Sequence, residues 1–93
     1  MAAARPQQTA MTDVVGDLCF TKLTNDPEEL LRFMNVAGYD GARLRAAVGT
    51  PALLRGMIEY VAGNEPLMLA VCAEGGIKPE AFMRVYYQLN PGG

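Results

Sequence analysis

Histidine, serine and tryptophan are absent from this sequence, and each absence narrows the chemistry open to it. Without histidine or serine, the chain forms neither a Ser–His–Asp triad nor a Cys–His pair. A zinc site would have to use two cysteines and carboxylates, because there is no histidine and no Cys-x-x-Cys motif. We therefore expect no catalytic residue, no cofactor and no metal.

The sequence also lacks an excess of basic charge and a long apolar run. Eight basic and ten acidic residues give a net charge of −2, whereas proteins that bind duplex DNA normally carry a basic excess. The most apolar stretch, PLMLAVCA at 66–73, is too short to span a bilayer. The start, MAAARPQQTA, has no apolar core of a signal peptide. We expect a soluble cytoplasmic protein with neither nucleic acid nor membrane as partner.

Cysteine occurs twice, as Cys19 and Cys72, each inside an apolar segment. Their spacing is compatible with a disulfide, but small secreted domains stapled in this way usually carry more cysteines. We favour two buried thiols in a reducing compartment.

Residues 1–11 predict a flexible leader, and residues 12–90 predict a single helical domain. No segment alternates apolar and polar residues with the period of two that strands require, so the expected class is all-α, a compact bundle of five or six short helices. The expected helices cover about 12–24, 25–38, 41–48, 49–64, 65–76 and 78–90. The helix at 65–76 is apolar on nearly every side, which is typical of a central helix.

Capping residues support these boundaries. Asp26 and Thr50 precede Pro27 and Pro51, and Gly38 stands where a helix ends in the left-handed conformation. In the helix at 25–38, the expected buried stripe is Leu30, Leu31, Phe33, Met34 and Ala37. We also expect two i,i+4 ion pairs, Glu28–Arg32 and Arg55–Glu59.

The sequence resembles itself after a shift of 39 positions, with one deletion near residue 75. This similarity predicts two three-helix units, 12–48 and 51–89, that pack against each other. Chance similarity between generic helix caps is the alternative. The glycine-containing stretch AGYDGARLRAAV at 37–48 has a counterpart at 75–86, so we interpret it as a helical corner. An anion-binding loop is the less favoured interpretation.

Two groups of residues are candidates for binding a partner. Arg32, Arg43, Arg45 and Arg55 stand against a single acid between positions 32 and 55, and this surplus suits an acidic segment or an anionic ligand. A solvated surface is the commoner explanation for such a group of charges. In the last helix, Met83 and Tyr87 lie one turn apart, away from the stripe of Phe82, Tyr86 and Leu89. Methionine and tyrosine suit adaptable interfaces, although a place in the core is the simpler interpretation.

Residues 26–89 contain, in order, DP-x2-L-x2-F, a glycine-closed corner, LR-x-A, P-x-LL-x2-M-x-(D/E)-(Y/F), and a second glycine-closed corner followed by xPE. This order resembles a small all-helical family known in alphaproteobacteria, the domain-of-unknown-function family 3572. The resemblance implies a bacterial cytosolic helical protein. It implies no activity, cofactor or site residue.

The leading hypothesis is a protein-interaction module that binds an unknown protein partner or itself. The alternative is a carrier or sensor that holds a small apolar or anionic ligand between the two halves. An enzyme that uses Cys19 or Cys72 as an unaided nucleophile is the weakest hypothesis.

Overall fold

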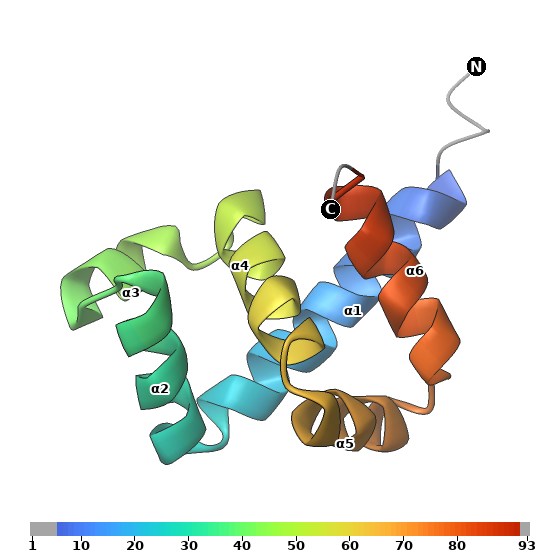
Figure 1. Cartoon of the computed structure of the whole chain (residues 1–93). Coiled ribbons are helices and arrows are strands. Elements are labelled where there is room, and N and C mark those ends of the chain that lie inside the picture. The colour runs from blue at the N-terminus through green and yellow to red at the C-terminus, as the bar shows by residue number, and fades with distance from the viewer. Residues whose placement is uncertain (1–5, 92–93) are drawn as a thin grey trace.

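The computed structural model describes residues 6–91, with side chains from residue 11 onward, and this part of the chain contains helices and no strand. Figure 1 shows their arrangement as an all-α bundle, which confirms the predicted fold class. The six helices are α1 (Pro6–Thr24), α2 (Pro27–Ala37), α3 (Gly41–Ala47), α4 (Pro51–Ala62), α5 (Glu65–Gly75) and α6 (Pro79–Leu89).

The first helix is longer than predicted, because α1 begins at Pro6 and not at Thr12. Residues 6–11, expected in the leader, form its first turns, and residues 1–5 lie outside the described residues. Proline suits the first position of a helix, and the glutamine, alanine and methionine that follow are good helix formers. Met11 also packs against the core, which helps to hold these turns in place.

The helix starts at Asp26 and Thr50 are capped as the sequence predicts, and two further helices start in the same way. The side chains of Asp26, Asp40, Thr50 and Asn64 each accept a hydrogen bond from the backbone N–H three residues further on, at 2.7–3.3 Å. These bonds satisfy amides that a helix leaves unpaired at its start. At the start of α6, Lys78 has the extended backbone of a cap but makes no side-chain capping bond.

The two glycine corners have the same hydrogen bonds. Gly38 has φ +80°, and the N–H groups of Gly38 and Tyr39 both donate to the carbonyl of Met34. Gly76 has φ +69°, and the corresponding pair of N–H groups donates to the carbonyl of Cys72. Glycine is needed here because other L-residues are strained at positive φ. The AGYDGARLRAAV stretch is thus a corner, and the Asp40 side chain already accepts the Arg43 N–H, one of the amides that an anion would use.

The corners agree with a repeat, but the elements that follow them differ. The helix α3 has seven residues, none of them buried, whereas α6 has eleven and buries Phe82 and Val85. The two-unit repeat therefore stays a prediction.

The core lies where α1 and α4 cross. Both helices contact each other, and both contact α2, α5 and α6, as Figure 1 shows with α4 at the middle of the bundle. The prediction that α5 is central is wrong. Its buried side chains lie on one side, and Glu65, Leu69 and Glu74 on the other are exposed. Leu69, Ala70 and Ala73 are apolar residues outside the buried side, so the α5 sequence looks apolar all round although only one side of the helix is buried.

Two glycines let helices approach closely. A Cβ on Gly16 would lie 3.2 Å from the Cβ of Leu54, so the glycine in the middle of α1 allows close contact with α4. A Cβ on Gly75 would lie 2.7 Å from Cδ2 of Leu18 and nearer still to Cδ1, at the contact between α5 and α1. An ion pair of 2.6 Å between Lys22 and Glu74 joins the same two helices.

Three further expectations for α2 and α4 are wrong. Leu31 is 57% exposed, and Ala37 is also exposed, because the buried side of α2 centres on Phe33. Arg32 pairs with Glu29 at 2.9 Å instead of with Glu28. Among the described residues, no ion pair joins Arg55 and Glu59.

Candidate functional site

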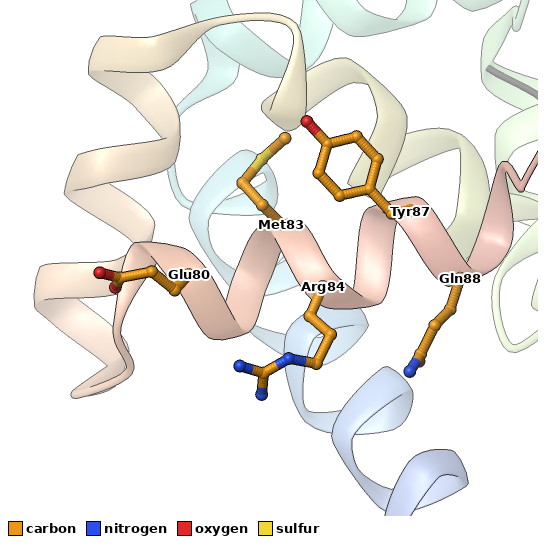
Figure 2. A pocket seen from close by; sticks show the side chains of 5 residues that line it. All are labelled: Glu80, Met83, Arg84, Tyr87 and Gln88. Carbon is orange, nitrogen blue, oxygen red and sulfur yellow. The ribbon is translucent and has the colours of Figure 1, made fainter.

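A hollow of about 510 Å³ lies on the outer face of α6 and is open to solvent (Figure 2). Its walls are two neighbouring rows of side chains, each with a spacing of four residues. One row is Met83 and Tyr87, and the other is Glu80, Arg84 and Gln88. Residues four apart form ridges on a helix, so this hollow is the groove between two ridges of α6.

The apolar wall of this groove is the pair that the sequence singled out. Tyr87 is 57% exposed, whereas Met83 is half-buried and also packs against the core. The ring of Tyr87 lies 5.5 Å from that of Tyr86, centroid to centroid. Figure 2 shows Met83 and Tyr87 projecting from the same side of α6, with Arg84 on another side. The two residues lie one turn apart on the same side of α6, as their spacing predicts. The simpler interpretation, a place in the core, does not hold for Tyr87, whereas Met83 does pack against the core. Their role in binding stays a prediction.

The other wall was missed. Glu80, Arg84 and Gln88 are not among the residues that the sequence predicts to bind a partner. The signal was present in the sequence, because these three residues repeat at intervals of four beside the Met83–Tyr87 row. This row gives the groove one acidic and one basic side chain.

The four arginines predicted as a basic surface have different surroundings. Arg32 on α2 is engaged by Glu29. Arg43 and Arg45 lie on α3, and Arg45 folds back so that a Cβ on Gly41 would lie 3.7 Å from its Nη1. Arg55 lies on α4 and lines a second hollow. Three helices thus carry the four side chains, and Arg32 is already paired.

That second hollow, of about 410 Å³, lies among α1, α4, α6 and the α3–α4 loop. Its lining comes from both predicted halves of the chain: Thr12, Asp13, Gly49, Pro51, Ala52, Leu54, Arg55 and Leu89. A volume of several hundred Å³ with a mostly apolar lining is within the range of small-molecule pockets. The hollow thus stands where the alternative hypothesis needs a ligand.

Both cysteines are free thiols buried in the core. Burial, with Cys72 nearby, raises the pKa of Cys19 to about 12. Burial also raises the pKa of Cys72, whose thiol donates to Sδ of Met68 at 3.6 Å. The thiolate is the nucleophilic form, so these environments work against thiol catalysis near neutral pH.

Within residues 6–91, no three metal-binding side chains of histidine, cysteine, aspartate or glutamate gather into a group that could hold an ion. In the same part of the chain, no helix combines the length and apolar character needed to cross a bilayer.

These features define a small all-helical protein with surface hollows, one on the face of α6 and another among α1, α4 and α6. The chain belongs to the family described as protein of unknown function (DUF3572), whose model matches residues 7–92. The resemblance seen in the motifs of residues 26–89 is thereby confirmed. Neither the comparison with curated proteins nor the comparison with solved structures gave a match.

Proposed function

We propose that this protein is an interaction module that docks a helix into the groove on α6. The observation that carries the proposal is the pair of side-chain rows around that groove, with Met83 and Tyr87 on one side. Helices pack when the ridge of one fits the groove of another, and two rows with four-residue spacing favour crossing angles near −50°. Tyrosine and methionine are common where such interfaces bury apolar surface.

The charges of the groove favour a second copy of this chain as the occupant. Glu80 and Arg84 line the same hollow with opposite charge. In a two-fold dimer each surface meets its own copy, so the acid of one copy can face the base of the other. The Met83–Tyr87 ridge of one copy would then fill the groove of its partner.

The proposal is tested by self-association of Tyr87→Asp, measured by sedimentation equilibrium. Tyr87 is the cleaner site because it does not belong to the core, whereas Met83 does pack against it. Removing an anchor from an interface centre typically weakens association by about tenfold or more. Leu31→Asp is the matched control, because Leu31 is equally exposed, at 57%, and lies on α2. Equal self-association of Tyr87→Asp and wild type would overturn the proposal.

A charge exchange tests the two-fold arrangement separately. Glu80→Arg and Arg84→Glu should each weaken self-association, because each gives the groove a single sign of charge. A mixture of the two variants should recover it as a heterodimer. Failure of the mixture to associate better than either variant alone contradicts the paired charges.

A second candidate function is the binding of a small ligand in the hollow among α1, α4 and α6. Its support is the lining contributed by both halves: Leu54 and Leu89 are apolar, Arg55 is a cation, and Thr12 and Asp13 come from the first half, with Asp13 as the one acid. Octanoate, which has an apolar tail and a carboxylate, is a suitable probe. A ligand at about 100 times its Kd stabilises the folded state by about 2.7 kcal/mol, which thermal denaturation detects. If octanoate raises the Tm of wild type and of Arg55→Gln equally, this site is not used.

We further propose that the protein acts in the bacterial cytoplasm, without enzymatic activity and without binding nucleic acid or membranes. The net charge of −2 supports the proposal that the protein does not bind nucleic acid. The raised pKa values of Cys19 and Cys72 support the proposal that neither thiol acts as a catalyst.

A further inference from the structure

A groove separate from α6 runs between α2 and α4 and on to the α4–α5 corner. It consists of two adjoining hollows, of about 440 and 570 Å³, that share Val36, Glu59 and Tyr60. The first extends to Gly56, and the second covers the corner at 63–66. From Gly56 to Gly63 the α4 axis rises about 10 Å, which is two turns of helix. We call these two hollows together the α2–α4 groove.

Gly56 keeps this groove open without being needed for packing. A Cβ at this position would lie 3.9 Å from Cε1 and Cζ of Phe33, an ordinary contact distance. Gly16 differs, because its Cβ would crowd Leu54 at 3.2 Å. Glycine inside a helix costs about 0.5–1 kcal/mol relative to alanine, so Gly56 is unfavourable to α4 and has no steric requirement behind it.

Two apolar side chains stand out in the walls of the groove: Val36 is exposed, and Tyr60 is held in place by its neighbours. Val36 is 76% exposed, the most exposed large apolar side chain among the described residues. Tyr60 is fixed by a short hydrogen bond that its hydroxyl donates to Glu29 and by edge-to-face contact with Phe33 at 5.5 Å between ring centroids. Fixed walls reduce the entropy lost when a partner is bound.

The charged side chains that line the groove have one sign. They are Glu59 and Glu65, both exposed, and no lysine or arginine lines either hollow. Neither carboxylate has an ion pair among the described residues. Glu29 is different, because its carboxylate already accepts hydrogen bonds from Tyr60 and Arg32. Glu59 and Glu65 are therefore available to a cationic partner.

We propose that the α2–α4 groove binds a basic amphipathic helix of another protein. Its apolar residues would cover Val36 and Tyr60, and lysine or arginine side chains on its flanks would meet Glu59 and Glu65. Two turns of groove match apolar anchors at i, i+4 and i+7 of the bound helix. The proposal goes beyond the docking on α6, since it concerns another surface and a partner of opposite charge.

The probe is a fluorescent helical peptide with leucine at i, i+4 and i+7 and lysine on both flanks. A second peptide has glutamate in place of lysine. The full chain should bind the lysine peptide saturably and at least about tenfold more tightly than the glutamate peptide, as measured by fluorescence anisotropy at low salt. Amide chemical shifts should change along Val36, Gly56, Glu59 and Tyr60.

The double variant Glu59→Lys/Glu65→Lys tests the negative charge of the groove. The variant Gly56→Leu tests the space that Gly56 leaves open in it. Each should weaken binding of the lysine peptide by about tenfold or more. Glu28→Lys is the matched control, because Glu28 is exposed on α2 and lines neither hollow. Val36→Ser, a change at an exposed site, keeps the test informative if Gly56→Leu fails to fold.

Three results would overturn this proposal: no saturable binding of the lysine peptide, equal binding of the two peptides, or equal weakening by Glu28→Lys. Failure of this proposal can be distinguished from failure of the α6 proposal. Glu59→Lys/Glu65→Lys should leave self-association through Tyr87 unchanged, and Tyr87→Asp should leave peptide binding unchanged.

Discussion

Replacement of Gly56 by alanine should stabilise the protein, although Gly56 lies in the middle of a helix that contacts most of the bundle. Alanine favours a helix interior by about 0.5–1 kcal/mol over glycine. The new methyl group would meet Phe33 at 3.9 Å, so no steric cost opposes this gain. For a domain of this size, the gain corresponds to a rise in Tm of about 2–8 °C.

Replacement of Gly75 by alanine should have the opposite effect. Its Cβ would lie 2.7 Å from Cδ2 of Leu18, and the leucine would have to move within the contact between α1 and α5. Overpacking of this kind typically costs about 1–3 kcal/mol, which exceeds the gain from helix propensity. Differential scanning calorimetry of the two variants and wild type measures both shifts. A lower Tm for Gly56→Ala, or a higher one for Gly75→Ala, would refute the packing described for these helices.

Three further changes have defined outcomes. Above pH 9 the unfolded chain loses the Cys19 proton, whereas the folded chain keeps it up to about pH 12. The free energy of unfolding should therefore fall with rising pH, by about 1.4 kcal/mol per pH unit from this thiol. Urea titrations at several pH values should show a shallower fall for Cys19→Ala than for the wild type, and an unchanged slope would contradict the burial of Cys19. Tyr60→Phe removes the hydrogen bond to Glu29 and should cost about 0.5–1.5 kcal/mol in urea denaturation, whereas no loss would mean that the bond is not formed in solution. Lys78→Asp supplies the missing cap of α6 and should raise stability by about 1 kcal/mol, with a lower Tm as the opposing result.

The sequence predicted the helix boundaries well wherever they depend on neighbouring residues. Asp26 and Thr50 act on amides three residues away, and Gly38 and Gly76 supply a positive φ within their own turn. Such signals are local, so they can be recognised without the tertiary structure. The start of α1 differs from the prediction, because the helix expected from residue 12 begins at Pro6.

The arrangement of the helices could not be predicted in the same way. The apolar character of residues 65–76 suggested a central helix, but position in a bundle depends on which faces meet, and α4 has that place. Leu31 shows the same limit, because its neighbour Phe33 fixes which side of α2 is buried.

The two candidate surfaces also differ in whether their residues are close together in the sequence. The Met83–Tyr87 pair was found because both residues lie on one helix at a spacing of four. The α2–α4 groove was not found, because packing brings Val36 together with Gly56 and Tyr60, about twenty positions away in the chain. The arginine surface was predicted from the acids between positions 32 and 55, so it did not include the Glu29 carboxylate, which pairs with Arg32. The role of these arginines in binding stays a prediction.

Sedimentation equilibrium of the wild type and Tyr87→Asp over the same concentration range shows directly whether α6 is an interaction surface. We expect a reversible dimer for the wild type and for Leu31→Asp, with association weakened by about tenfold or more in Tyr87→Asp. Circular dichroism should show equal helix content in all three proteins. A wild type that stays monomeric throughout, or a Tyr87→Asp variant that dimerises as the wild type does, would contradict the α6 proposal.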